Sequence, residues 1–169
     1  MKSFPARRLT QAALFTALVT VVTMAVNVPV PATQGIINVG DSMIFTAALL
    51  AGPRLGLFAG GVGSALANLL LGMNIWAPWT LVIKGLEGFI VGSLGHRAFR
   101  ASGKVTAPVL AAVVIGGLWM VFGYFLAGSF LFGYRAALVE FPGNLVQAAG
   151  SAMIAIPLVH ALRRVELLS

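Results

Sequence analysis

Cysteine is absent from this 169-residue sequence, and acidic residues are scarce: there are four, beside eleven lysines and arginines. Without cysteine, the chain has no disulfide, no thiol nucleophile and no cysteine-ligated metal. Charged residues of both signs make up only 9% of the chain, compared with ~25% in a typical soluble domain. The GxxxxGK[ST] phosphate-binding loop is also missing, so ATP hydrolysis would require a partner protein.

Hydrophobic residues account for 59% of the sequence, and the mean hydropathy is +0.98. These values predict an integral membrane protein. At ~20 residues per crossing, the chain accommodates six transmembrane helices in a single domain, 1–169, with no separate soluble domain. A net charge of +7 would suggest nucleic-acid binding in a soluble protein. Here the basic residues lie in short segments between apolar runs, so we expect no nucleic-acid partner.

The expected fold is an all-α bundle of six membrane-spanning helices. Proline, glycine and charged residues delimit the helices at residues 9–27, 36–53, 56–71, 78–97, 107–128 and 142–162. The second of these is barely long enough to cross a bilayer. We expect an aromatic loop at 129–135, and we interpret the first apolar run as a retained span rather than a cleaved signal.

The basic residues indicate how the bundle is oriented. If the N-terminus is cytoplasmic, nine of the eleven basic residues fall on the cytoplasmic side, as the positive-inside rule requires. These nine are Lys2, Arg7, Arg8, Arg54, Arg97, Arg100, Lys104, Arg163 and Arg164. Arg135 falls in an outer loop, and Lys84 lies within the membrane. Both termini are therefore predicted to be cytoplasmic, with Glu166 in the C-terminal tail.

Lys84 and Glu87 stand three residues apart inside a long apolar stretch, PWTLVIKGLEGFIVG, at Pro78–Gly92. This spacing places both side chains on one face of a helix. Charged groups inside a bilayer are unfavourable by at least a few kcal/mol each, so they indicate a functional site. The alternative is a structural pair whose charges neutralise each other.

Most other polar residues fall in the outer half of the expected bundle. The candidate substrate-binding residues are Asn68, Asn74, Trp79, Lys84, Glu87, Glu140, Asn144 and Gln147, the last two sharing a helical face with Ser151. The inner halves are almost purely apolar, which argues against a continuous channel and favours a pocket open to the outside. Alternative roles are an N-cap for Asp41, amides that join helices, and tryptophans such as Trp76 in an interfacial belt.

Catalytic and metal-binding roles are not expected. The chain offers no Ser–His set, and His96 and His160 belong to different helices without nearby carboxylates. We therefore predict a binding protein without a cofactor, rather than a membrane enzyme. A channel or facilitator that acts alone, and a purely structural membrane subunit, are the other candidate classes.

Small residues favour close helix packing at two places. Ala13 and Ala17, beside Leu14 and Leu18, form a flat stripe on the first helix, and glycines recur along the third helix. Both patterns permit helices to approach closely in a membrane.

Three stretches carry a resemblance to a known family: INVGDSMIFTAALLAGPRLGLFAGGVGSALANLL, PWTLVIKGLEGFIVG and FPGNLVQAAGSAMIAIPLVHALRR. They resemble the membrane-embedded, substrate-binding S components of energy-coupling factor (ECF) vitamin transporters. The resemblance covers nearly the whole chain. It implies that a vitamin or precursor is captured from outside the cell, with the loop Val28–Val39 as a gate over the pocket.

The resemblance also implies partners and a location. Members associate with a transmembrane coupling protein, the T component, and two ABC-type ATPases in the lipid of a prokaryotic cell membrane. The family's Ala-x-x-x-Ala motif, which contacts the coupling protein, matches Ala13 and Ala17.

The stretches KGLEG and NLVQ look most similar to members that handle hydroxymethylpyrimidine, pyridoxine or related thiamine precursors. For such a ligand, Glu87 or Glu140 would accept a hydrogen bond from a ring amino or hydroxyl group. Riboflavin and other vitamins are the alternative substrates.

Overall fold

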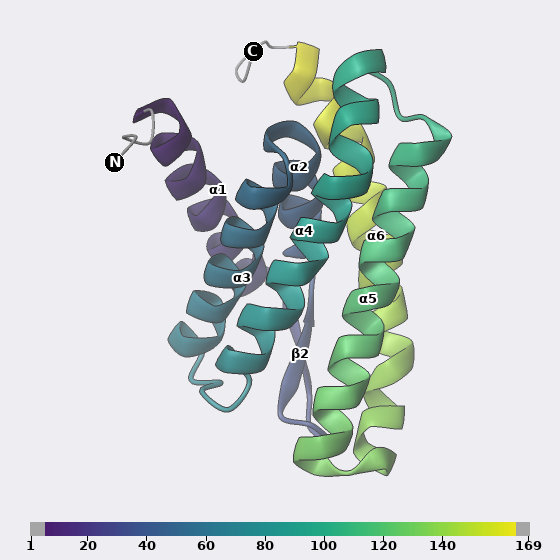
Figure 1. Cartoon of the computed structure of the whole chain (residues 1–169). Helices are drawn as coiled ribbons and strands as arrows, with labels where there is room; N and C mark the ends of the chain where they lie inside the picture. Colours follow the sequence, from purple (N-terminus) through teal and green to yellow (C-terminus); the bar gives the residue numbers. More distant parts are fainter. Residues whose placement is uncertain (1–5, 165–169) are drawn as a thin grey trace.

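The computed structural model describes residues 6–164 and shows a bundle of six helices with one β-hairpin (Figure 1). In chain order the elements are α1 (Ala6–Ala25), β1 (Asn27–Val30), β2 (Gly35–Asn38), α2 (Asp41–Ala51), α3 (Pro53–Leu70), α4 (Ala77–Ser102), α5 (Ala107–Phe132) and α6 (Tyr134–Arg164). Lys2 and Glu166, which we assigned to the cytoplasmic side, lie outside the described residues. The six predicted helices are thus present, although several of their bounds differ from expectation.

Three of the helices in the described part, α1, α5 and α6, are long and apolar enough to cross a membrane. In α3 and α4, glycines and charged residues interrupt the apolar character. The apolar helix α2 has only 11 residues, or about 16 Å at ~1.5 Å per residue, against a hydrocarbon core of ~30 Å. The hairpin continues below α2 along the bundle, so these two elements together match the height of the longer helices (Figure 1).

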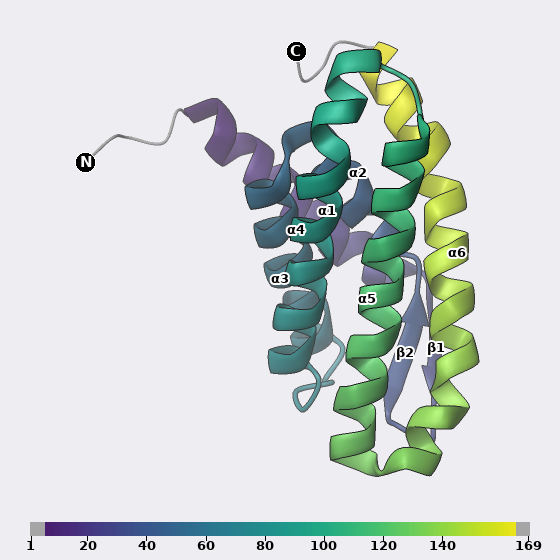
Figure 2. The same ribbon diagram turned by 45° about the vertical axis from the view of Figure 1, so that its right-hand side comes forward.

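The segment expected to be an irregular loop before the second helix forms an antiparallel hairpin. Asn27 pairs with Asn38, and Val30 pairs with Gly35. The prediction of a helix from residue 36 is therefore wrong at its start, because Ile36 and Ile37 are β-branched and prefer the extended conformation. The hairpin lies beside α6, in the half of the bundle away from the two termini (Figure 2).

The expected aromatic loop at 129–135 is also wrong. Helix α5 continues to Phe132 and α6 begins at Tyr134, so a single non-helical residue, Gly133, makes the turn with a φ of +89°. Glycine alone adopts such a conformation without strain. Pro142, which we expected to open the last helix, instead lies inside α6.

Helices α3 and α4 pack through glycines, as predicted for the third helix. A Cβ atom added at Gly60 would lie 2.6 Å from the carbonyl oxygen of Lys84, and one at Gly56 would lie 2.6 Å from that of Gly88. Only glycine permits backbones to approach so closely. Helix α4 also packs against α2 and α5, so it is surrounded on several sides. This position explains how Lys84 is buried in the bundle.

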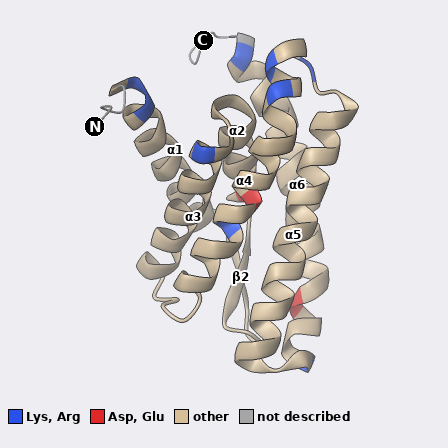
Figure 3. Ribbon diagram, in the orientation of Figure 1, with Lys and Arg blue, Asp and Glu red and all other residues tan. Residues whose placement is uncertain are grey.

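Lysine and arginine gather at the end of the bundle where both ends of the chain lie (Figure 3). This end is formed by the start of α1, the start of α3, and the ends of α4 and α6. There Arg163 donates hydrogen bonds to the carbonyl oxygens of Phe99 and Arg100, which joins α6 to the last turn of α4. Arg135 belongs to the first turn of α6, at the opposite end. The separation of charge along the bundle is the one expected from the sequence.

Candidate functional site

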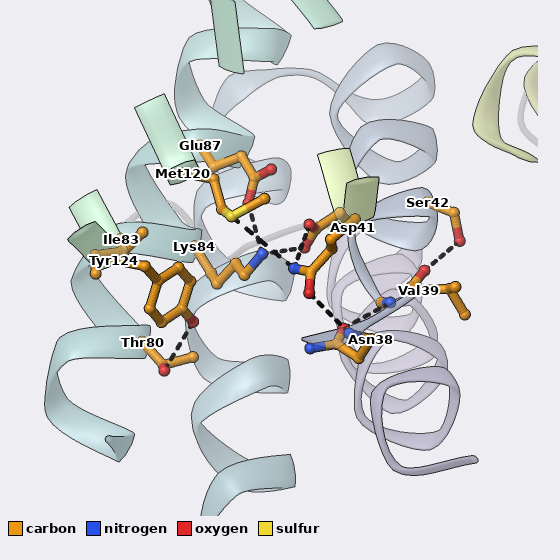
Figure 4. Close-up of polar contacts among 12 residues, drawn as sticks. Asn38, Val39, Asp41, Ser42, Thr80, Ile83, Lys84, Glu87, Met120 and Tyr124 are labelled. Carbon is orange, nitrogen blue, oxygen red and sulfur yellow. Dashed lines mark hydrogen bonds and ion pairs between the residues drawn. The ribbon is translucent and has the colours of Figure 1, made fainter. Parts of the chain in front are cut away.

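Lys84 extends from α4 into the interior and meets two carboxylates (Figure 4). Its ammonium group contacts Asp41 Oδ1 and lies 3.3 Å from Glu87 Oε2. All three side chains are at most 2% exposed. Asp41 is the first residue of α2, whose N-cap is Gly40 and has no capping side-chain bond. The N-cap interpretation of Asp41 is therefore wrong, and this residue is the principal partner of Lys84.

Gln147 of α6 ties this charge cluster to the hairpin. Its Nε2 donates to Asp41 Oδ2 at 2.8 Å, and its Oε1 accepts from the backbone N–H of Asn38 at 2.7 Å. Asn144 and Ser151, predicted to share its helical face, are buried as well. One amide thus links α6, α2 and β2.

A second polar group lines the α4–α5 side of the site. Asn68 Nδ2 donates to Thr80 Oγ1 at 2.8 Å, and Thr80 Oγ1 lies 2.9 Å from the hydroxyl of Tyr124. The ammonium group of Lys84 stands 5.4 Å from the centre of the Tyr124 ring, in the range of a cation–π contact. The ring and the hydroxyl groups therefore adjoin the charge cluster (Figure 4).

The tip of the hairpin is held by an indole and a carboxylate. Trp76 Nε1 donates to the backbone oxygen of Thr33 at 3.0 Å, and Glu140 is hydrogen-bonded to the side chains of Thr33 and Asn144. Trp76 is 2% exposed and its ring lies 5.6 Å from that of Tyr124. Trp76 is thus a wall of the interior rather than part of an interfacial belt.

These groups enclose a pocket between the hairpin and the helices. It is lined by Thr23, Gly35, Ile36, Asn38, Ser64, Asn68, Met73, Trp76, Thr80, Lys84, Tyr124 and Glu140. The space open to the centre of a water molecule is about 20 Å³, which suffices for about one water. A heterocyclic ring is larger, so its entry requires the hairpin or the neighbouring side chains to move.

The structure brings most of the candidate residues together. Asn68, Lys84 and Glu140 line the pocket, while Glu87, Asn144 and Gln147 are buried and adjoin the charge cluster or Glu140. Two candidates lie elsewhere. Trp79 is 37% exposed and packs against Phe130, and Asn74 is exposed in the α3–α4 turn.

Sequence reasoning missed several residues of the site, among them Tyr124 and Thr80, and it favoured an N-cap role for Asp41 over a role in the site. Tyr124 and Thr80 gave no signal, because single hydroxyl groups in apolar helices are common and bond readily to the local backbone. Asp41 gave a usable signal: it is one of four acidic residues and precedes a strongly apolar run, so a buried cation was a plausible partner.

The small-residue stripe of α1 lies on the outside of the bundle. Ala13 and Ala17 are exposed, and the adjacent Leu14 and Leu18 are 52% and 37% exposed. This face of α1 is not covered by the described residues.

Comparison with known proteins decides the family. The family model of the ECF-type riboflavin transporter S component matches residues 3–164. The chain belongs to this family. It is therefore a membrane-embedded component of a transport system.

Three individual proteins are also similar in sequence to this S component. A Pyrococcus woesei protein, described as an uncharacterized protein in a gap 3′ region, is 44% identical over 146 residues, which cover 86% of this chain and 95% of the relative. The thiamine precursor transporter HmpT of Lactococcus lactis is 27% identical over 164 residues, covering 96% and 92%. A UPF0397 protein of Streptococcus agalactiae is 30% identical over 100 residues, covering 59% and 54%.

Proposed function

We propose that this S component binds a small vitamin precursor at the outer face of the membrane and delivers it through an ATP-driven ECF module. The ligand class is a heterocycle of the hydroxymethylpyrimidine, pyridoxine or thiamine-precursor kind. The similarity to the thiamine precursor transporter HmpT, along 96% of this chain, supports that class.

The observation that carries the proposal is the buried polar pocket beneath the hairpin. A small heteroaromatic ring can stack on Trp76 and Tyr124. At the edge of such a ring, Lys84 can donate a hydrogen bond and Glu140 can accept one. We assign Asn68 to the same wall, and we assign Glu87, Asn144 and Gln147 to holding these groups in place. The predicted contacts of Trp79 and Asn74 with the ligand would occur on its way in, since neither lines the closed pocket.

The proposed topology has six crossings, with both termini in the cytoplasm of a prokaryotic cell. The basic end of the bundle supports this orientation through the positive-inside rule (Figure 3). The pocket then lies in the outer half, and α2 with the hairpin serves as one composite crossing. The exposed stripe at Ala13 and Ala17 supports a lateral contact with the transmembrane coupling protein, which in turn binds two ATPases.

Riboflavin is the second candidate ligand, because the matching family model is described by that vitamin. Its ring system has three fused cycles and a ribityl chain. Compared with a pyrimidine, this larger ligand would demand a greater displacement of the hairpin and of the side chains that line the pocket. A single-ring ligand is therefore favoured.

Native mass spectrometry of the detergent-purified protein, followed by thermal-shift titration, tests the proposal. The titration compares hydroxymethylpyrimidine, pyridoxine and riboflavin. We expect a retained single-ring heterocycle and a saturable rise in melting temperature with sub-micromolar half-saturation. A response to riboflavin alone would transfer the proposal to the second candidate. A protein inert to all three would instead favour a facilitator or structural subunit.

Three variants separate binding from assembly. Glu87→Gln and Asn144→Ala should weaken ligand binding, because each alters a buried group that adjoins the pocket wall. Ala13→Trp should leave binding unchanged but abolish copurification with the coupling protein and ATPases, since the indole would project from the exposed stripe. Wild-type affinity in both pocket variants would contradict the assignment of the pocket.

A further inference from the structure

The charges buried around the pocket do not balance. Among the described residues, three carboxylates and one ammonium group lie there: Asp41, Glu87, Glu140 and Lys84. They are 0%, 0%, 4% and 2% exposed, respectively. Three acidic groups thus surround a single basic group, so the pocket and its wall have no positive charge to spare for a ligand.

Lys84 is already engaged by the protein itself. Its ammonium group contacts Asp41 and lies 3.3 Å from Glu87, and neither Glu87 oxygen accepts a hydrogen bond within the described structure. A negatively charged ligand at Lys84 would therefore compete with two buried carboxylates for one cation. Removing the cation from either carboxylate would leave a buried charge without a partner, which is strongly unfavourable.

Glu140 adds a third buried carboxyl group, on the wall beside the hairpin. A Cβ atom added at Gly35 would lie 3.1 Å from Glu140 Oε1, so the carboxyl group packs directly against the backbone of the hairpin. The remaining lining residues are uncharged, and Lys84 is the only basic residue among those that line the pocket. Arg135, the other basic residue of this half, is exposed on α6.

We propose, on the basis of the function assigned above, that the pocket selects its ligand by charge. It accepts the neutral or singly positive form of a heterocycle, with an amino or hydroxyl group directed at Glu140. It rejects the phosphate ester or carboxylate of the same ring. The transporter therefore imports the unphosphorylated compound, and a phosphoryl-transfer reaction must follow inside the cell wherever the phosphorylated form is used.

The discrimination should be large. One unit charge about 6 Å from the ligand, at an effective dielectric constant of ~20, corresponds to roughly 100-fold in the dissociation constant. An added phosphate brings between one and two negative charges at neutral pH. We thus expect the phosphate ester to bind at least about 100-fold more weakly than the parent alcohol.

Thermal-shift titration of the purified full chain with matched pairs tests this selection. The pairs are hydroxymethylpyrimidine and its monophosphate, pyridoxine and its 5′-phosphate, and riboflavin and its 5′-phosphate. The expected result is saturable binding of at least one neutral member and a loss of about 100-fold or more for its phosphate. Binding of both members with similar affinity would overturn charge selection and leave the proposed function intact. No response to any neutral member would remove both.

A variant pair assigns the effect to the pocket. Glu140→Gln keeps the shape of the side chain and removes its charge, so the ratio of the two dissociation constants should fall by about tenfold or more. Arg135→Gln is the matched control, because it changes the charge of the same half of the protein at an exposed position, where solvent screens it. The control should keep the wild-type ratio. An unchanged ratio in Glu140→Gln, or an equal change in both variants, would refute the role of Glu140.

Discussion

Replacing Lys84 by methionine should destabilise the folded protein more than any change on its surface. Methionine has a similar length and fits an apolar bundle, so the substitution removes the charge while largely preserving volume. The carboxylates of Asp41 and Glu87, both 0% exposed, would then face each other without a cation.

The magnitude follows from the burial of the cluster. Breaking a buried ion pair by removing one partner lowers the free energy of unfolding by ~3–5 kcal/mol. For a chain of this size, 1 kcal/mol corresponds to ~2–4 °C in melting temperature, so the loss should be at least about 6 °C. Neutralising the carboxylates as well, in the triple variant Asp41→Asn/Lys84→Met/Glu87→Gln, removes the uncompensated charges. This variant should recover at least half of the loss.

Melting curves of the three ligand-free proteins in one detergent, at equal concentration, measure these differences. The triple variant is the essential comparison, since it retains the methionine and restores only the charge balance. A Lys84→Met protein that melts within about 1 °C of the wild type would refute the reasoning, because such a shift corresponds to less than ~0.5 kcal/mol. A triple variant no more stable than Lys84→Met would show that charge imbalance is not the cause.

Two further predictions concern packing and the hairpin. Gly60→Ala should lower the melting temperature, because overpacking typically costs ~1–3 kcal/mol and the added Cβ would lie 2.6 Å from a backbone oxygen of α4. Gly150→Ala, in α6 with nothing within 4 Å of its added Cβ, should be tolerated, and equal effects of the two would contradict the packing assignment. Trp76→Phe should speed hydrogen exchange at the hairpin by removing the bond to the backbone of Thr33. Trp79→Phe, whose ring packs against Phe130 instead, should not, and unchanged exchange in Trp76→Phe would refute the tether.

The helical framework was predictable because it depends on local composition. Apolar runs of about 20 residues, bounded by proline, glycine and arginine, predicted six helices, and residues 6–164 contain six. The gathering of lysine and arginine at one end of the bundle was predictable too, because these residues lie in the segments between apolar runs. Lys84 and Glu87 were recognisable because a charge within an apolar run is improbable without a partner, and their i, i+3 spacing brings them within 3.3 Å.

The hairpin was not predictable from the same rules. Its two prolines, Pro29 and Pro31, signal a loop, yet proline is compatible with the edge of a sheet, and both strands of a two-stranded sheet are edges. The pairing of Lys84 with Asp41 was equally hidden, since 43 residues separate them and only the packing of α2 against α4 brings them together. Long-range contacts of this kind leave no periodic trace in the sequence.

The hairpin and the charge cluster are mechanically joined, which restricts how the pocket can open. Gln147 holds Asp41 through one atom and the backbone of Asn38 through another, and these two residues are only three positions apart. The base of the hairpin is bonded to Gln147 and lies only two residues before α2 in the chain, so it should stay anchored, while the tip at Thr33 has only side-chain contacts with Trp76 and Glu140 and should swing away first. A ligand entering by that route meets Glu140 before it reaches Lys84, so Glu140 at the mouth of the pocket would already disfavour an anionic ligand.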